Sequence, residues 1–543
     1  MQGKKHYTEK LFNNFHLSER VPKENFYRQL KEQISFQFLY KDTKNYYGSE
    51  GQKSIDPVVF FKLILVGYLE NLNSDRKIIE HAKMRLDILY FIGYDIDEEL
   101  PWHSTLSRTR QLLGEEIFLE LFRTVLKLCI DKGMVSGTRQ AVDSAYIKAN
   151  ASLSSLVEKE VMDDAKTFND ELANNDESRR MPIQRDEKIT NEKQTISYLR
   201  KKKVERHHKW KAEQYKGQHK MSMELMESEA ENRPKFLSNH THYSTTDPDA
   251  RISVKPGKPR QMNYSAQTVV DTSHHVITNI QADYSDKRDS QSLQAVVEQT
   301  KNNLAESGLE VKEILADTGY SSGTALKYLE EQNITGYIPN FGKYKPSREG
   351  FIYNKEKDQY ECQQGNKAVL PYKSTSTDLL GFEKKSYRSS TKDCRACPLR
   401  KECIGKKATY KKIDDSIHKP HYDKMHARMQ SKNAKRMMRL RSSTVEPVLG
   451  TLINFTGMRR IYTRGIKGAN KFMLCAAIAY NLKKYLKFIS RKARTKAKIA
   501  FAPLENRTLL TIGDTLLTIF RLAAVVKRYI TIPHVRDRYY RLP

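Results

Sequence analysis

The sequence is poor in cysteine and has no long apolar run. Its 6 cysteines among 543 residues are too few for the disulfide framework that holds small secreted domains together. No stretch reaches the roughly 18 apolar residues that span a bilayer. The closest stretch, residues 509–526, carries Asp514 and Arg521 and predicts a buried helix. The opening residues, MQGKKHYTEK, lack the apolar core of a secretory signal. We therefore expect a cytoplasmic protein with no membrane partner.

Acidic residues are also in short supply. The chain has 95 Lys and Arg residues against 65 Asp and Glu, a formal charge of +30, and a pI near 9.6. Such an excess favours a polyanionic partner, with nucleic acid ahead of an anionic membrane surface. At this length the chain can form several domains and bury a sizeable core.

Residues 1–135 predict an all-helical domain. Residues 56–72 are almost continuously apolar, and residues 74–94 repeat apolar side chains at helical spacing. A basic helix with Arg108 and Arg110 follows. Two helices before a basic third are typical of a helix-turn-helix whose last helix enters the major groove. An ordinary helical bundle with a solvated basic face is the alternative.

From residue 139 the periodicity becomes that of a mixed α/β sheet. Asp143 lies in the middle of an alternating strand, and Asp317 directly follows a buried one. Sites in such sheets lie at the carboxyl ends of strands. The expected elements are a strand at 139–149, a hairpin at 261–283 turning at Asp271, helices at 289–306 and 323–332, and strands ending at Asp317 and at 334–340.

Two insertions interrupt this core. Residues 155–238 are dominated by charge and predict an exposed helical insertion; their basic run is either a solvated face or a track for phosphates. Residues 341–430 carry most of the cysteines. The catalytic core would then combine residues 136–154, 239–340 and 431–490, while residues 491–543 have no clear assignment.

Three acids stand on separate predicted elements: Asp143, Asp317 and Glu446. Carboxylates from different elements can hold two divalent cations about 4 Å apart, the arrangement that promotes phosphoryl transfer. Each acid also has an ordinary explanation. Asp143 suits an exposed strand position, Asp317 a helix cap, and Glu446 a capping box with Ser443. Pro447 disfavours helical backbone at Glu446.

Five segments resemble, in order, the motif blocks of DDE-type bacterial insertion-sequence transposases. They are AVDSAYIKANAS, STTDPDARISVK, NYSAQTVVDTSHHVIT, ADTGYSS and STVEPVLGTLINFTGMRRIYTRG. The stretch through PWHSTLSRTRQ is similar to the helical N-terminal domain of the same group, so the resemblance covers roughly residues 30–485. It implies a ribonuclease H-like core in which Asp143, Asp317 and Glu446 are catalytic and bind Mg²⁺ or Mn²⁺.

The resemblance also implies the reaction and the partners. DNA would be hydrolysed at the transposon ends, and the freed 3′-hydroxyl would be joined to target DNA. Chemistry on paired ends implies a homo-oligomer assembled on double-stranded DNA, in the bacterial nucleoid.

Basic residues around the predicted site are expected to contact phosphates. Many relatives carry an Arg before the Glu and a Lys one or two turns after it, both directed at the DNA backbone. Here Arg441 precedes Glu446, but Ile453 and Asn454 stand two turns beyond. A plain surface cluster is the alternative to DNA contacts. The candidate residues are Arg441, Arg459, Arg460, Arg464, Lys467, Arg108 and Arg110.

Four of the cysteines have the spacing C-x31-C-x2-C-x5-C: Cys362, Cys394, Cys397 and Cys403. Four thiolates around one ion are the usual structural zinc site. Free surface thiols or a redox pair are the alternatives. Such a zinc site would stabilise an insertion that has little core of its own. Cys129 and Cys475 lie in apolar helical runs and are expected in the core.

The sequence therefore predicts a metal-dependent transposase that binds terminal inverted repeats and cleaves and transfers DNA strands. A non-catalytic DNA-binding regulator, or a decayed transposase, is the first alternative, and metal-dependent cleavage separates it from the enzyme. A ribonuclease H-like nuclease without strand transfer is the second, and specific binding of transposon ends separates the two.

Overall fold

The computed structural model describes residues 16–48, 50, 54–158, 238–239, 241–253, 260–342, 344–377, 383–405 and 408–500, with side chains to residue 491. Most of the predicted insertion at 155–238 and of the tail at 491–543 lies outside these residues. The chain divides into two units, Met1–Lys483 and Lys484–Pro543, and the first contains the folded elements discussed below. No described helix is long and apolar enough to cross a membrane.

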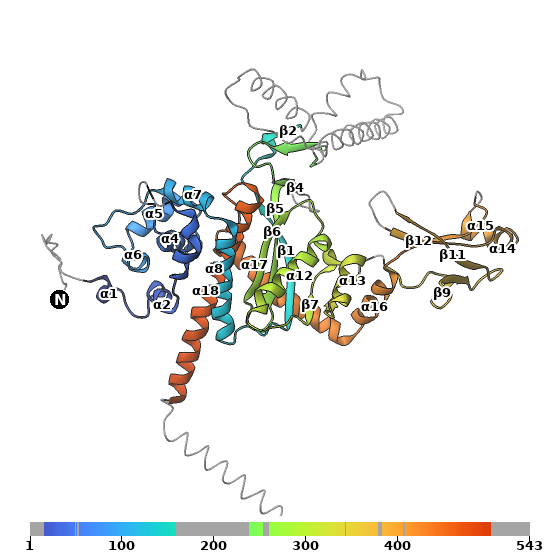
Figure 1. Ribbon diagram of the computed structural model, residues 1–543. Coiled ribbons are helices and arrows are strands. Elements are labelled where there is room, and N and C mark those ends of the chain that lie inside the picture. The colour runs from blue at the N-terminus through green and yellow to red at the C-terminus, as the bar shows by residue number, and fades with distance from the viewer. Residues whose placement is uncertain are drawn as a thin grey trace, which may run out of the picture. The chain divides into compact units, whose positions relative to one another are not determined.

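The N-terminal part is helical, as predicted (Figure 1). Asp56 accepts hydrogen bonds from the amides of Val58 and Val59, and Pro57 follows it at the first helical position. The helices are α1 (Leu17–Arg20), α2 (Phe26–Gln33), α3 (Phe38–Thr43), η1 (Lys44–Tyr46), α4 (Pro57–Leu69), α5 (Asp75–Lys83), α6 (Leu86–Ile92), α7 (His103–Leu112) and α8 (Glu115–Asp131).

The apolar pattern at 74–94 forms two helices rather than one. Arg85 has extended backbone between α5 and α6. Both helices turn apolar residues inward, Ile78 and Ile79 in α5 and Ile88 and Leu89 in α6. The spacing of apolar residues therefore continues across the break and does not reveal it.

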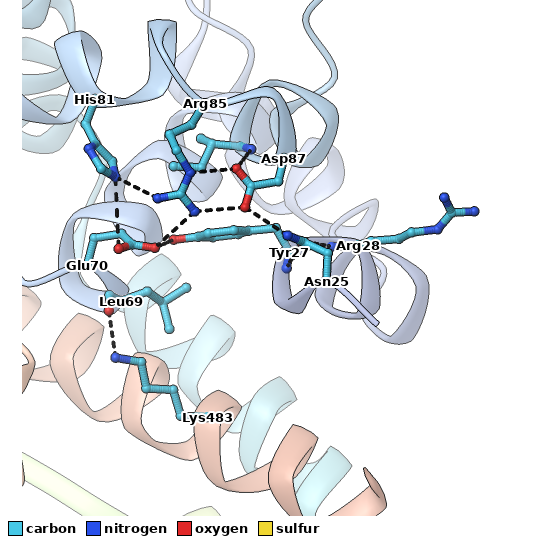
Figure 2. Close-up of polar contacts among 10 residues, drawn as sticks. Asn25, Tyr27, Arg28, Leu69, Glu70, His81, Arg85, Asp87 and Lys483 are labelled. Atoms are coloured by element: carbon cyan, nitrogen blue, oxygen red, sulfur yellow. Dashed lines mark hydrogen bonds and ion pairs between the residues drawn. The ribbon is translucent and has the colours of Figure 1, made fainter. Parts of the chain in front are cut away.

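A polar cluster joins these helices (Figure 2). Arg85 donates to both carboxylate oxygens of Asp87 at 2.8 Å, and the Asn25 amide donates to the same carboxylate at 3.0 Å. The Tyr27 hydroxyl donates to Glu70 at 2.7 Å. The cluster fixes α2 against α6 and against the end of α4.

The central sheet is mixed, as expected. Its strands are β1 (Arg139–Lys148), β4 (Arg251–Ser253), β5 (Gln261–Asp271), β6 (Ile277–Tyr284), β7 (Glu313–Leu315) and β8 (Thr335–Tyr337). The order is β4-β5-β1-β7-β8, and β6 also pairs with β5. Strand β1 runs antiparallel to β5 and parallel to β7, and β7 runs parallel to β8. The predicted hairpin is β5–β6, and its turn begins at Asp271.

Helices cover this sheet: α12 (Asp289–Ala305), α13 (Gly323–Glu331), α16 (Lys419–Met429), α17 (Lys432–Phe455) and α18 (Gly465–Ala500), with the short 3₁₀ helix η3 (Thr318–Tyr320) after β7. In α17, Ala434 and Met437 pack against Leu315 of β7 and Tyr337 of β8. Helix α17 therefore crosses the sheet where β7 ends.

Helix α18 covers the edge of β6 with two asparagines. The Asn481 amide donates to the Ile277 carbonyl at 2.9 Å and accepts from the Ile277 amide at 3.0 Å. Asn470 accepts from the Ala282 amide at 2.8 Å. Backbone groups of an edge strand otherwise invite pairing with another chain, so these two side chains complete the sheet.

Two lysines of α18 bind the ends of N-terminal helices. Lys471 donates to the carbonyls of Arg110 and Leu113, at the end of α7. Lys483 donates to the carbonyl of Leu69, the last residue of α4, at 2.6 Å (Figure 2). The last carbonyls of a helix have no partner within it, and a cation satisfies them. Helix α18 thus contacts both the helical domain and the sheet.

The cysteine-bearing insertion has a sheet of its own: β9 (Phe351–Asn354), β10 (Gln359–Cys362), β11 (Val369–Thr377), β12 (Glu383–Arg388) and β13 (Lys412–Ser416), with helices α14 (Thr391–Arg395) and α15 (Arg400–Ile404). Tyr360, Leu370, Tyr387 and Ile413 form a core there. The prediction that this insertion has little core is therefore wrong.

The charged insertion leaves and rejoins the core through a short ribbon. After η2 (Leu153–Ser155), strand β2 (Leu156–Glu158) pairs antiparallel with β3 (His242–Ser244). The residues between the two strands lie largely outside the described part.

Candidate active site

Strand register brings Asp143 and Asp317 to one edge of the sheet. In the parallel pair β1–β7, Ala141 lies opposite Leu315. Each aspartate stands two residues beyond its paired residue, so both follow the same level of the sheet. Burial raises the pKa of Asp143 above its usual value; the charge of Arg441 lowers it and that of Asp317 raises it again. The two carboxylates therefore repel each other.

Arg441 of α17 links Asp143 to Glu446. One terminal nitrogen of Arg441 lies 2.9 Å from Asp143 Oδ2, and the other lies 3.3 Å from Glu446 Oε1. The side chains of Arg441 and Asp143 are 13% and 18% exposed, whereas that of Glu446 is 58% exposed. Glu446 thus stands at the rim of the site and Asp143 inside it.

Glu446 lies within a helix, despite Pro447. Helix α17 is 24 residues long and includes this proline. Its cap is Ser431, whose hydroxyl accepts from the Ala434 amide at 3.1 Å. Ser443 instead donates to the Leu440 carbonyl, so the capping-box interpretation of Ser443 and Glu446 is wrong. Pro447 removes only one backbone donor, and packing on the sheet maintains the helix around it.

Asp317 also caps a helix. Its Oδ1 accepts from the Gly319 amide at 2.9 Å, at the start of η3. The ordinary explanation of this residue is therefore confirmed for a short 3₁₀ helix. The cap fixes the direction of the carboxylate and does not occupy its second oxygen.

The sequence analysis missed a fourth carboxylate here, Asp289 at the start of α12. Gln267 donates to Asp289 at 3.0 Å and accepts from the buried Tyr320 hydroxyl at 2.5 Å. Burial raises the pKa of Tyr320, and the charges of Asp289, Asp143 and Asp317 raise it further. A Cβ on Gly319 would lie 3.0 Å from Asp317 Oδ1 and 3.1 Å from Asp289 Oδ2. Glycine therefore lets both carboxylates approach η3.

The donor chemistry of this site suits a hard divalent cation, because it consists of carboxylate oxygens. The geometry is less complete. Among the described residues, no three His, Cys, Asp or Glu side chains converge closely enough to hold a metal ion. The positive group between Asp143 and Glu446 is the guanidinium of Arg441, so an arginine stands where a cation would be attracted.

The cations expected to bind phosphate near this site differ in exposure. Arg459, Arg464 and Lys467 are exposed between α17 and the start of α18. Arg460 is partly buried, donates to Asn150 at 3.2 Å and lies over the Tyr462 ring. Exposed guanidinium and ammonium groups remain available to a polyanion, whereas Arg460 already supports the local fold.

The segment STTDPDARISVK holds the start of α18. Asp247 is fully buried and accepts from the Gly465 amide at 3.0 Å and from the Tyr264 hydroxyl at 2.7 Å. Asp249 accepts from the Ile466 amide at 2.9 Å. Both carboxylates lie at the positive end of the helix dipole, and they set the position of the exposed cations next to it.

The two N-terminal arginines have different surroundings. Arg108 is exposed and donates to Ser104 at 3.2 Å. Arg110 donates to both oxygens of Asp75, at 2.7 and 3.0 Å, and its side chain is 18% exposed. Its guanidinium therefore joins α7 to α5 and is not offered to phosphate, contrary to the expectation.

The four spaced cysteines line one cavity of about 30 Å³ in the insertion, together with Asp393 and Leu370. Cys362 lies in β10, and Cys394 and Cys403 lie in α14 and α15. All four are free thiols, and the described residues do not bring three of them into a metal-binding arrangement. Their thiolates suit zinc chemically. Cys129 and Cys475 are buried, as predicted.

A carboxylate group at the end of adjacent strands, with exposed cations beside it, defines a site for a phosphate-bearing substrate. Residues 15–112 match a family described as a transposase domain, DUF772, and residues 361–486 match the transposase DDE domain family. These matches support a DDE-type transposase. The second match contains Glu446 and the four cysteines, whereas Asp143 and Asp317 lie outside it. A comparison with curated proteins gave no match.

Proposed function

We propose that this chain is a DDE-type transposase that cleaves DNA at the ends of a mobile element and joins the freed 3′-hydroxyl to target DNA. The observation that carries the proposal is the register that places Asp143 and Asp317 at one sheet edge, with Glu446 connected through Arg441. The strand order β6-β5-β1-β7-β8, with only the first three antiparallel, supports a ribonuclease H-like core.

The residues divide the work by charge. Asp143, Asp317 and Glu446 would hold Mg²⁺ or Mn²⁺, which supplies activation of the attacking oxygen and stabilisation of the leaving oxygen. Arg459, Arg464 and Lys467 would hold the phosphate backbone near these acids. The cap that Asp317 makes on η3 orients its carboxylate before any ligand arrives. DNA is the partner, and paired ends require more than one copy of the chain.

The test compares wild type with Asp317→Asn on a duplex carrying the element's own end, with Mg²⁺ and with chelator. We expect cleavage by wild type only with metal, no cleavage by the variant, and end binding at least as tight in the variant because a carboxylate that repels phosphate is gone. Asp97→Asn, at an exposed loop position, is the matched control. Metal-dependent cleavage by Asp317→Asn at the wild-type rate contradicts the proposal.

A non-catalytic regulator is the second candidate, favoured by one observation. Arg441 neutralises Asp143 and Glu446 in place of a metal ion. This candidate predicts that wild type binds the element's end but cleaves neither strand with Mg²⁺ or Mn²⁺. Cleavage of either strand by wild type excludes it.

We further propose that Cys362, Cys394, Cys397 and Cys403 hold a structural zinc ion. Their shared cavity supports this, and the ion would join β10 to α14 and α15. Metal analysis of the purified protein should find one zinc per chain, reduced in Cys397→Ser and unchanged in Cys129→Ser. Zinc-free wild-type protein contradicts the assignment.

A further inference from the structure

Helix α17 carries a row of exposed cations that leads toward Glu446. Lys432, Lys435, Arg436 and Arg439 are all exposed. On the same helix, Ala434 and Met437 face the sheet. Residues three and four apart share a helix face, so the four cations and Glu446 follow the side turned away from the core. We call these four residues the α17 basic row.

No carboxylate balances this row. Up to Phe455, Glu446 is the only acid in α17, and the first turn has none. Among the described residues, none forms an ion pair or a hydrogen bond with the side chain of any member of the row. An ordinary solvated helix face mixes charges of both signs at these spacings.

The arrangement is electrostatically unfavourable for the helix itself. Lys432 and Arg436 are four residues apart, as are Lys435 and Arg439, and like charges at this spacing repel. Lys432 and Lys435 also stand in the first turns, at the positive end of the helix dipole. A bound polyanion would relieve both effects.

We infer that the α17 basic row binds the backbone of the DNA segment that leads into the carboxylate site. This deepens the proposed function and rests on it for the identity of that site. From Lys432 to Glu446 the helix rises about 21 Å at 1.5 Å per residue. That length matches about six base pairs of duplex, at 3.4 Å per step. The row therefore tracks one segment of backbone and ends at the acid expected to act on it.

The first experiment is lysine labelling, read by mass spectrometry, with end-bearing duplex in chelator. Lys432 and Lys435 should be modified several-fold more slowly when DNA is bound, while the exposed Lys355 and Lys357 of the insertion react at an unchanged rate. Unchanged labelling of Lys432 and Lys435 on bound protein overturns the inference. Equal protection by polyglutamate also overturns it, because the row would then recognise acidic polypeptides.

The second experiment neutralises the row with Lys432→Gln, Lys435→Gln, Arg436→Gln and Arg439→Gln together. The slope of log affinity against log salt should fall by about 3.6, because each phosphate contact contributes about 0.9. The control replaces the exposed Lys355, Lys357, Lys373 and Lys392 by Gln. It changes net charge equally and should alter the slope by less than about 1.

These measurements separate the inference from the proposed function. Labelling and salt dependence need no cleavage, so protection of the row stands even when wild type cleaves nothing. A row variant with an unchanged salt slope overturns the inference, while loss of cleavage in Asp317→Asn still supports the enzyme. The unfolding midpoint of the row variant should stay the same or rise, because repulsion within α17 is removed.

Discussion

The guanidinium of Arg441 lies 2.9 Å from the carboxylate of Asp143, a residue 298 positions earlier in the chain. Asp143 is mostly buried and lies close to a second acid, so this contact supplies most of the positive charge that it meets. The pair joins α17 to the central strand β1.

Arg441→Ala should destabilise the protein by about 3 kcal/mol, because it leaves a buried carboxylate without its partner. The pKa of Asp143 should rise further, since Arg441 lowers it at present. Denaturant unfolding checks the first expectation. The double variant with Asp143→Asn should cost less than the sum of the two single variants, and an additive result contradicts the pairing. Mg²⁺ should raise the unfolding midpoint of Arg441→Ala more than that of wild type.

Tyr320→Phe should weaken the site from behind. It removes the hydroxyl that Gln267 accepts and leaves a buried amide oxygen unsatisfied, at a cost of about 1–3 kcal/mol. Because Tyr320 ends the 3₁₀ turn that Asp317 caps, DNA cleavage should fall while DNA binding stays unchanged. Tyr372→Phe, at an exposed position, is the control. Wild-type stability and cleavage in Tyr320→Phe would show that the contact has no consequence.

Asn481→Leu should expose the edge of β6. The amide and carbonyl of Ile277 lose their only partner in α18, which should cost about 2–4 kcal/mol at about 1–3 kcal/mol for each buried group. Unpaired edge groups also promote association between chains. Denaturant unfolding and light scattering measure the two effects. Asn302→Leu, exposed on α12, should show neither, and a monomeric, fully stable Asn481→Leu contradicts the prediction.

The helical domain should lose stability in acid through Asp87 (Figure 2). Burial raises the pKa of this carboxyl, but hydrogen bonds from Arg85 and Asn25 and the charge of Arg85 leave it below its usual value of 3.8. The folded state therefore favours the charged form. Its contribution is complete above the unfolded pKa and is lost as pH falls through the lower folded pKa.

Asp87→Asn should thus lower stability by about 1–2 kcal/mol at pH 7, a value reduced by the partial exposure of Arg85. The gap between variant and wild type should close as pH falls below 3.8. Thermal unfolding between pH 7 and pH 3 measures this, with Glu80→Gln, exposed on α5, as the control. A gap that is constant down to pH 3 rules out the ion pair as its cause.

Much of the central fold was predictable, because strands and helices there alternate with clear periodicity. Asp143 and Asp317 were found as acids at strand positions, and a parallel register then brings them to one level. Asp289 was missed because an acid at the first residue of a helix is ordinary. Only the contact of α12 with η3 makes it part of the site.

Other features depended on contacts that no local pattern contains. Arg110 stands on an exposed-looking basic helix, but its partner Asp75 lies 35 residues away, on a helix whose crossing angle the sequence does not state. The insertion core is built from Tyr360 and Tyr387, which stand among charged residues. Pro447 argued against a helix at Glu446, and packing of α17 on the sheet outweighed it.

The position of Asn481 in α18 has a consequence during synthesis. It follows Ile277, the edge residue that it covers, by 204 residues. At about 5–20 residues per second, the nascent chain carries an open β6 edge for about 10–40 s before α18 leaves the ribosome. Slow translation beyond Ile277 would lengthen that interval, and neighbouring nascent chains on one messenger would have more time to pair through this edge. Yield of soluble protein should therefore respond to codon choice between these two residues.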